Sequence, residues 1–348
     1  MTRRELLAMV PAAAAANAGR AAEIPFERID THNHIHRSAP ALVAIMEKAG
    51  WRGLSICDSR EIGDQVSGLP EMIAGTIKFH LESKRRWAWA TTFDARGFED
   101  HGFADRVIGK MRQGFDQEAI AVKIWKNVGM WIRAMSGEYL LPDNQALMPV
   151  YEAVQKADKT LICHLAEPDG AWMPLDAPGN TETGYLRSHP EWQMYGREGA
   201  PSKDTILTAR DRVVARHPKL RVVGCHLGSN EENLDRLAKR LDALPNFAVD
   251  LASRVRYLMA GDREKVRQFV LKYQDRILYA TDFTLGAGED ERAGRSLEAT
   301  HDREWNFFAT GEMVAARGGQ VQGLALPETV LRKIFRENAV RWLPGILG

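Results

Sequence analysis

The chain has 348 residues, of which 45% are hydrophobic and 27% are charged, and this balance excludes a largely disordered protein. The formal net charge is only +1, so no strong electrostatic field argues for binding to nucleic acid or to an acidic membrane surface. No run of about 18 apolar residues occurs, which excludes an ordinary transmembrane helix.

The first residues differ in composition from the rest of the chain. Arg3 and Arg4 are followed by Leu6 and Leu7, then by an alanine-rich run. This order of regions resembles a twin-arginine export signal. We therefore expect residues 1–23 to be a leader segment and the protein to be periplasmic. The alternative is an amphipathic helix packed on the following domain of a cytoplasmic protein.

From residue 24 onward, short β-rich runs alternate with helical stretches. We expect strands at 26–32, 52–58, 87–93, 119–125, 160–165, 221–227, 246–252 and 276–283, and helices between them, for example at 40–48, 147–156, 205–216, 233–244 and 263–273. Eight strands alternating with helices predict a parallel sheet, and eight is the number that closes a barrel. The predicted fold for residues 24–348 is thus an α/β protein with a single (β/α)8 TIM barrel, closed by an amphipathic helix at 331–343.

The segment 166–203 interrupts this alternation. It follows the fifth predicted strand and contains Trp172, Tyr185, Trp192 and Tyr195. A connection of this length is usually functional, and it leaves from the strand ends where barrel active sites lie. We expect a lid-like insertion, although a surface excursion or a subunit contact would also explain its aromatic residues.

Three cysteines, Cys57, Cys163 and Cys225, lie in predicted strands. Their odd number and their positions favour buried thiols over disulfide bonds. Where a histidine follows a cysteine, as in Cys163–His164 and Cys225–His226, strand alternation predicts that the histidine faces the barrel centre and the thiol faces the helices.

Polar residues cluster at the carboxyl ends of the predicted strands. His32 and His34 end the first strand, His164 the fifth, His226 the sixth and Asp282 the eighth. In a closed barrel these ends meet at one rim, and residues two apart on a strand share a face. Each residue alone is weak evidence, because an isolated histidine or aspartate after a strand is common.

Together these residues suit a divalent metal site. Imidazole and carboxylate groups are ligands for Zn²⁺, with Mn²⁺ or another divalent ion as an alternative. Such an ion would acidify a water molecule and polarise a substrate oxygen. We expect His36 to lie in a loop outside the ligand set. The remaining histidines, His80, His101, His189, His217 and His301, are expected at the surface, with His189 placed to reach a substrate.

The pattern Asp-Thr-His-x-His, followed by His164, His226 and Thr281-Asp282, resembles the amidohydrolase superfamily, and in particular its single-domain, amidohydrolase-related branch of decarboxylases and lactonases. The resemblance spans residues 26–342. It implies that His32, His34, His164 and Asp282 hold one metal ion, that His226 acts beside it, and that Asp282 also moves a proton.

The resemblance also draws attention to the fourth strand, where binuclear members carry a carboxylated lysine that bridges two metals. Here Lys123 and Lys126 are the candidates, and strand alternation would direct either Lys123 with Trp125 or Lys126 inward. We expect Lys123 to bind an anionic or hydroxylated substrate and Lys126 to be a surface residue. Arg254, beyond the seventh strand, is a further substrate-binding candidate, as are Trp125 and Trp172.

These residues predict a metal-dependent hydrolase that acts on a lactone, an amide or a related carbonyl of a small acidic or hydroxylated compound. A metal-dependent decarboxylase of an aromatic or muconate-type acid would use the same residues and is the alternative. A metal-binding barrel without catalytic activity is the third hypothesis. We also expect a homo-oligomer.

Overall fold

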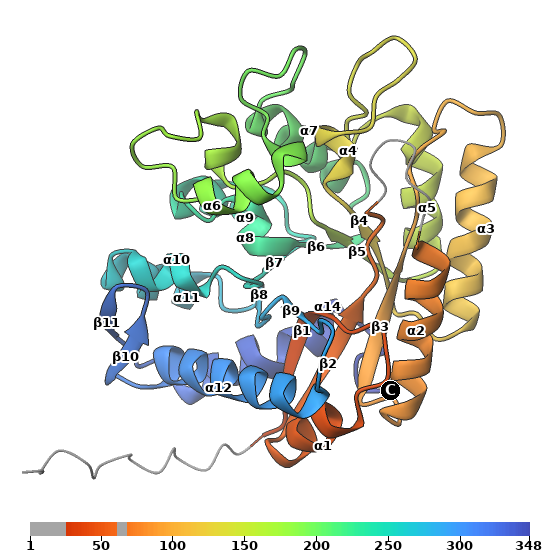
Figure 1. Cartoon of the computed structure of the whole chain (residues 1–348). Coiled ribbons are helices and arrows are strands. Elements are labelled where there is room, and N and C mark those ends of the chain that lie inside the picture. The colour runs from red at the N-terminus through yellow and green to blue at the C-terminus, as the bar shows by residue number, and fades with distance from the viewer. Residues whose placement is uncertain (1–25, 61–67) are drawn as a thin grey trace, which may run out of the picture.

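The computed structural model describes residues 26–60 and 68–348, which form a curled parallel sheet with helices around it (Figure 1). The expected leader, residues 1–23, lies outside these ranges, so export stays a prediction. Among the described helices, none combines the length and the apolar character needed to cross a membrane.

The main sheet has nine parallel strand segments in the order β8-β7-β6-β5-β4-β3-β2-β1-β9. The segments are β1 (Arg28–His34), β2 (Trp51–Ile56), β3 (Trp87–Thr92), β4 (Ala121–Ile124), β5 (Thr160–Cys163), β6 (Arg221–Gly224), β7 (Phe247–Asp250), β8 (Ile277–Leu278) and β9 (Phe283–Thr284). Their order follows the chain, as expected for a TIM-barrel-like α/β fold.

The sheet closes through residues 277–284, whereas we expected one continuous strand at 276–283. β8 pairs with β7, while β9 pairs with β1 in the register Asn33 to Phe283. Between them, the Thr31 N–H donates to the Tyr279 carbonyl at 3.0 Å. The expected eighth strand is split because Asp282 has a left-handed backbone, with φ of 67°, which a regular strand does not accommodate.

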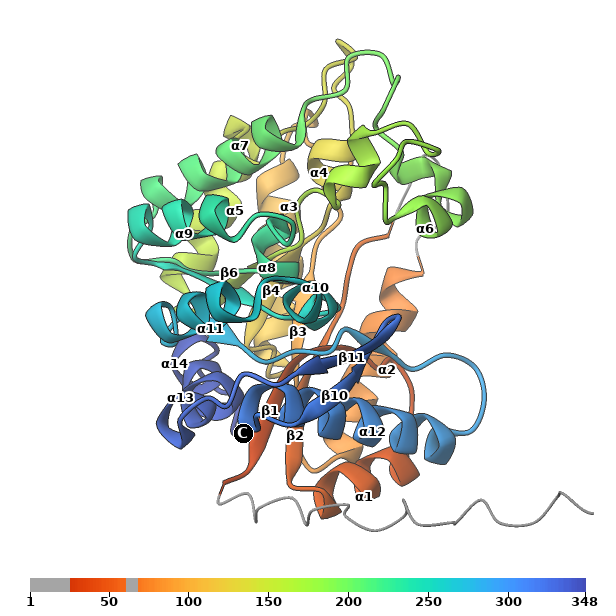
Figure 2. The same cartoon turned by 90° about the vertical axis from the view of Figure 1, so that its left-hand side faces the viewer.

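Helices cover the outside of this sheet (Figures 1 and 2). Along the chain they are α1 (Pro40–Lys48), α2 (Leu69–Glu82), α3 (Phe103–Asp116), α4 (Asn127–Met130), α5 (Met148–Lys156), α6 (Thr183–Ser188), α7 (Lys203–Arg216), α8 (Cys225–Ser229), α9 (Leu234–Ala243), α10 (Val255–Ala260), α11 (Arg263–Lys272), α12 (Asp290–Ala309), α13 (Glu328–Arg332) and α14 (Asn338–Trp342). A π-helical turn, Lys333–Glu337, joins the last two.

Several helices begin where the sequence provides an N-cap. Ser202, Asn233 and Asp262 each accept a hydrogen bond from a backbone N–H in the first turn of α7, α9 and α11. Such caps satisfy N–H groups that have no partner inside the helix. They explain why these three helices begin close to the predicted positions.

The core has two main layers, one on each side of the strands, and a small third cluster of Cys57, Trp89 and Ala119. The larger layer lies between strands and helices. The smaller one joins alternate strand residues such as Ile29, Leu54 and Ile162 to Trp342 and Ile346 at the end of the chain. The C-terminal segment thus closes one end of the barrel, as predicted, and the opposite end carries the polar residues described below.

The insertion after β5 contains short helices rather than one long loop. These are η2 (Asp169–Trp172), α6 and η3 (Pro190–Trp192). Leu186, Trp192 and Met194 are buried in the larger core layer, which anchors the insertion to the barrel. A second excursion, the antiparallel hairpin β10 (Met313–Ala316) and β11 (Gly319–Gln322), follows α12 and contacts α10.

All three cysteines are free and buried, as predicted. Three of the histidines expected at the surface, however, are buried. The His80 ring contacts the Trp87 carbonyl and Glu118, the His217 ring contacts the Val213 carbonyl, and the His301 ring contacts Asp30. The prediction was wrong because each of these three rings finds a hydrogen-bond partner inside the fold, whereas His101 and His189 are exposed.

Replacing the buried Trp342 by alanine should lower the free energy of unfolding by about 3–5 kcal/mol, because a large side chain leaves a cavity in the smaller core layer. The Asp275 carbonyl would also lose the hydrogen bond that it accepts from the indole N–H. Urea denaturation measures the effect. The matched change Val340→Ala, on the exposed side of the same helix, should cost about 0.5 kcal/mol or less. Equal losses in both variants would contradict this account of the core.

Candidate active site

Five polar side chains from different parts of the chain meet at the carboxyl end of the barrel. His32 Nε2 lies 3.5 Å from Asp282 Oδ1, and His34 Nε2 lies 3.4 Å from the same oxygen. The His226 ring lies 5.2 Å from the His32 ring, between centroids. His164 contacts His226, with 4.2 Å between the ring centroids.

Hydrogen bonds fix the tautomers of the two histidines on β1. His34 Nδ1 is 2.9 Å from the Ile56 carbonyl, which can only accept, so Nδ1 carries the proton. His32 Nδ1 is 2.9 Å from the carboxylate of Asp250 and donates to it. Both rings therefore present the lone pair of Nε2 toward Asp282, the arrangement found in metal-binding histidines.

The same reasoning distinguishes His226 from His164. His226 Nδ1 donates to the Ala252 carbonyl at 2.8 Å, so Nε2 accepts, and it accepts from His164 Nδ1 at 3.3 Å. That leaves His164 Nε2 with a lone pair, buried and without a hydrogen-bond partner among the described residues. An unpartnered buried acceptor is costly, and a bound cation would satisfy it.

Asp250 belongs to this polar cluster, and the sequence analysis missed it. Its buried carboxylate accepts three hydrogen bonds, from His32 Nδ1, from the His226 N–H at 2.7 Å and from the Ala252 N–H at 3.1 Å. It ends β7 just as the other polar residues end their strands. The rule applied to the other strand ends would have found it, had strand seven been included.

Left-handed turns bring two of these side chains into the site. His226 has φ of 59° and Asp282 has φ of 67°, both unusual for residues other than glycine. Because the turn at His226 ends strand alternation, Cys225 also faces inward, packing with strand residues of the smaller core layer and lying near His32 and Asp250. The predicted outward direction was therefore wrong for Cys225, whereas Cys163 does pack toward the helices.

Burial sets the charge of these groups. It lowers the pKa of His32, His164 and His226 below the ordinary 6.5, to about 3 for His226, because a charged imidazole would lose its hydration. Burial alone would raise the pKa of Asp282, but the neighbouring His226 and His34 outweigh it and lower that pKa. At neutral pH the site therefore combines neutral imidazoles with an ionised carboxylate.

The site opens into two adjoining hollows of about 560 Å³ and 350 Å³, which we call the active-site cavity. His164, His226 and Asp282 line both, together with Lys126 and Tyr185. The active-site cavity thus gives a small molecule direct access to the polar cluster.

Both lysines of strand four lie inside the barrel rather than one inside and one at the surface. Lys123 is fully buried, and its ammonium donates to His32 Nε2 at 3.0 Å. Lys126 lines the active-site cavity and donates to Glu167 and to the Tyr185 hydroxyl, the latter at 2.8 Å. The surface prediction for Lys126 was wrong because β4 ends at Ile124, and the alternation that separates the two lysines ends with it.

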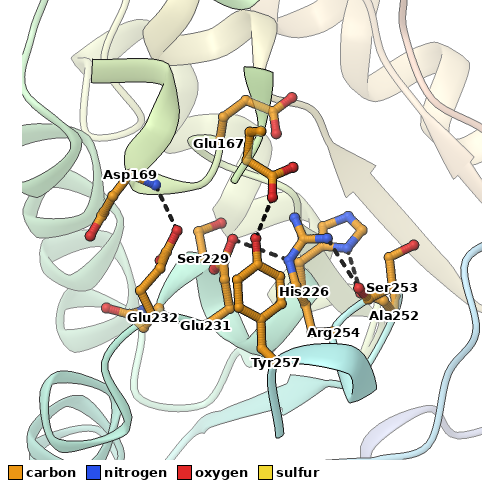
Figure 3. Close-up of polar contacts among 12 residues, drawn as sticks. Glu167, Asp169, His226, Ser229, Glu231, Glu232, Ala252, Ser253, Arg254 and Tyr257 are labelled. Carbon is orange, nitrogen blue, oxygen red and sulfur yellow. Dashed lines mark hydrogen bonds and ion pairs between the residues drawn. The ribbon is translucent and has the colours of Figure 1, made fainter. Parts of the chain in front are cut away.

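Of the other expected substrate contacts, Trp125 and Arg254 line the active-site cavity and Trp172 does not. Trp125 is buried and lines the smaller hollow, which His189 also lines. Trp172 instead packs against the core and donates its indole N–H to the Pro201 carbonyl at 2.9 Å. Arg254 is buried in the wall of the larger hollow, and Figure 3 shows it beside His226.

Arg254 is held by a partner that the sequence analysis did not single out. Glu231 accepts from Arg254 Nε at 3.1 Å. Burial would lower the pKa of Arg254, but the Glu231 carboxylate outweighs it and raises that pKa. The guanidinium is therefore a permanent positive charge in the cavity wall. Glu231 and Arg254 are 23 residues apart, with α9 and β7 between them and no motif that links them, so only the fold reveals the pair.

The residues present fit a divalent cation. His32, His34 and Asp282 place ligand atoms within 4.8 Å of one another, and His164 adds the unpartnered Nε2. Neutral imidazoles and an ionised carboxylate are the protonation states that bind metals. A cation at His32 Nε2 would replace the Lys123 ammonium, so Lys123 must give up that hydrogen bond when a metal is held there.

Comparison with protein-family models decides the family. Residues 131–345 match the model described as Amidohydrolase. The chain belongs to the amidohydrolase family. This match confirms the resemblance seen in the sequence, and proteins of this superfamily are enzymes. A search of curated proteins gave no significant match.

Solved structures share the fold of this amidohydrolase at low sequence identity. A TIM-barrel protein from Bordetella bronchiseptica is 13% identical, with a TM-score of 0.53 over 92% of this chain and 99% of its own. The 2,6-dihydroxybenzoate decarboxylase from Rhizobium is 13% identical, with 0.55 over 91% and 98%. A dihydroxybenzoic acid decarboxylase from Polaromonas, with bound manganese and an inhibitor, is 12% identical, with 0.52 over 91% and 97%.

Glu304, in the wall of the larger hollow, should make stability depend on pH. Burial raises its pKa from 4.5 to about 7, so between these values the folded protein keeps a proton that the unfolded chain has lost. The free energy of unfolding should therefore fall as the pH rises through this window. Glu304→Gln should remove this loss, gaining about 3 kcal/mol relative to wild type between pH 4.5 and 8.

Urea denaturation of both proteins at pH 4.5 and pH 8 measures this difference. Glu298→Gln, on the same helix, controls for the loss of one negative charge. A Glu304→Gln effect of the same size at both pH values would contradict the prediction.

Proposed function

We propose that this amidohydrolase is a metal-dependent hydrolase that acts on a lactone, an amide or a related carbonyl of a small acidic compound. The observation that carries the proposal is the orientation of the imidazoles at the active-site cavity. His32 and His34 direct Nε2 lone pairs at Asp282, and His164 keeps a third, unpartnered lone pair.

His32, His34, His164 and Asp282 are the residues that would hold the metal ion. Nitrogen and carboxylate ligands suit Zn²⁺, and the manganese-containing structure from Polaromonas makes Mn²⁺ the second candidate. When bound, such an ion acts as a Lewis acid that polarises a carbonyl oxygen and acidifies a water molecule.

Asp282 is the residue best prepared to take a proton. Its carboxylate is ionised and borders the active-site cavity, and Oδ2 accepts a hydrogen bond from the Ser253 hydroxyl at 3.0 Å. That bond orients the carboxylate while leaving Oδ1 directed at the β1 histidines. Asp282 would accept a proton from the attacking water and return it to the leaving group.

His226 acts beside Asp282 through Nε2. Since Nδ1 is committed to the Ala252 carbonyl, a neutral His226 can only accept at Nε2. At present His226 Nε2 accepts from His164 Nδ1. When the His164 ring rotates to bind the metal ion, Nε2 would accept a hydrogen bond from a water or a substrate hydroxyl instead. This assigns His226 to orientation of the nucleophile, in place of the oxygen-stabilising role that a protonated ring would have.

Two cations indicate an acidic substrate. Arg254, held by Glu231, and Lys126, held by Glu167, line the larger hollow together with His226 and Asp282. The planar guanidinium of Arg254 can bind a carboxylate through two hydrogen bonds. We propose that Arg254 binds the substrate carboxylate and that Lys126 binds a neighbouring oxygen.

The same two cations favour a second candidate function, non-oxidative decarboxylation of an aromatic or muconate-type acid. In that reaction the substrate carboxylate is the group that leaves, and the fold is shared with decarboxylases of dihydroxybenzoic acids. Hydrolysis remains our first proposal because Asp282 is ionised and positioned to accept a proton, the step that activation of water requires.

Asp250→Asn should weaken metal binding by about 10-fold to 100-fold, because the amide cannot accept the His32 Nδ1 proton as strongly as the carboxylate does. Chelator competition with Zn²⁺ and with Mn²⁺ on dialysed protein measures the affinity. Asp235→Asn, an exposed aspartate, is the matched control. Protein that binds neither ion would refute the metal site, and equal affinities in wild type and Asp250→Asn would refute the role of Asp250 in holding His32.

Metal-loaded protein should release protons from lactones or free amine from amides, without CO₂, in a panel of lactones, amides and aromatic or muconate-type acids. His226→Asn should lower kcat by about 10²-fold or more, because the nucleophile is no longer oriented. His101→Asn, at an exposed position, is the matched control. CO₂ release without net bond hydrolysis would replace the first proposal by the second, and turnover of no substrate would count against both.

A further inference from the structure

A second cavity of about 600 Å³ adjoins the active-site cavity. It lies where α6, α10 and the β10–β11 hairpin come together, and we call it the hairpin cavity. Figure 2 shows the hairpin lying against α10 and α12. These three elements lie outside the barrel strands, so the hairpin cavity is formed by features added to the barrel.

The two cavities share part of their walls. Glu182, from the segment just before α6, and Arg256, in α10, line both of them. The Glu182 carboxylate is buried and accepts from Arg256 Nη2 at 3.1 Å and 3.2 Å and from the Tyr257 hydroxyl at 2.6 Å. This hydrogen-bonded cluster therefore lies at the boundary of the two spaces, where Glu182 and Arg256 border both.

The chemistry of the lining differs between the cavities. The polar cluster, Lys126 and Arg254 line the active-site cavity. The hairpin cavity is lined in part by Met259, Ala316 and Val321, and by the ring of Tyr257. Asn180, Thr181, Thr183 and Arg317 complete its wall beside these apolar groups. A ligand that extended from one cavity into the other would therefore meet mainly charged groups at one end and a mixed wall with more apolar groups at the other.

We propose that the hairpin cavity is a subsite for an apolar arm of the substrate, whose acidic, reacting end lies in the active-site cavity. The inference rests on the proposed function, which it extends from a small acid to an acid that carries an aliphatic or aromatic arm. Arg256, which borders both cavities, contacts the polar group that joins the two ends.

The size of both cavities supports a small molecule as the occupant. Volumes of about 600 Å³ and 560 Å³ fall in the range of small-molecule sites. Burying the arm removes apolar surface from water, which would strengthen binding about fourfold for each methylene that enters. The polar wall at Glu182 and Arg256 would in contrast weaken binding of an apolar compound that lacks the acidic end.

Binding of unbranched carboxylates tests the proposal without any need for turnover. Hexanoate and decanoate are titrated calorimetrically into the metal-loaded full-length protein. Decanoate should bind at least about tenfold more tightly, because its additional methylenes reach the hairpin cavity. Equal affinities, or no binding of decanoate, would overturn the subsite.

Ala316→Trp and Val321→Trp, on the two facing strands of the hairpin, place an indole in the hairpin cavity. Each should abolish the advantage of decanoate and leave hexanoate binding unchanged, which also reports that the variant is folded. Ala315→Trp, the exposed neighbour, is the matched control and should keep the advantage. Loss of decanoate affinity in all three variants, or in none, would overturn the subsite.

These outcomes separate the subsite from the proposed function. If the protein prefers decanoate and Ala316→Trp removes the preference, yet no member of the substrate panel is hydrolysed, the subsite is supported and the hydrolase proposal is contradicted. If the protein hydrolyses a panel member but shows no preference for decanoate, the hydrolase proposal is supported and the subsite is contradicted.

Discussion

The arrangement of the site depends on the buried carboxylate of Asp250. This group ends β7, and it binds the ring of His32 on β1 and the backbone of His226 after β6. Burial alone would raise the pKa of Asp250, but its contacts with His32 and with the His226 N–H outweigh that effect and lower the pKa. A carboxylate that is ionised and dry must keep all of its hydrogen bonds, so it fixes the relative positions of three strand ends.

From this carboxylate the orientation of the other groups follows by the direction of their hydrogen bonds. A proton on His32 Nδ1 leaves a lone pair on Nε2, and a backbone carbonyl imposes the same tautomer on His34. A second carbonyl imposes it on His226, which in turn leaves the unpartnered lone pair on His164. The metal-ligating atoms are thus already oriented before a ligand binds. The packing of the surrounding fold compensates the free-energy cost of burying these polar groups.

Much of the scaffold was predictable because its causes are local. Apolar runs, N-caps and the alternation of strands with helices depend on neighbouring residues, and they located the elements to within a few positions. Local patterns failed where a turn interrupts a strand. The left-handed residues His226 and Asp282 ended the alternation, so the directions of Cys225 and the continuity of the last strand were predicted wrongly. The prediction that Lys126 lies at the surface failed for the same reason, since β4 is shorter than its apolar run.

The sequence by itself determined the TIM-barrel-like α/β fold, the membership of the amidohydrolase family and the strand ends that carry histidine and aspartate, because hydrophobic periodicity and residue type are written along the chain. The tertiary structure alone decided which side chains meet. Asp250, Glu231, Glu182 and the hairpin cavity involve residues far apart in sequence, and their partners are set by closure of the barrel and by the packing of its insertions. Burial, which determines the charge of each group, is likewise a property of the folded chain and leaves no mark on a linear sequence.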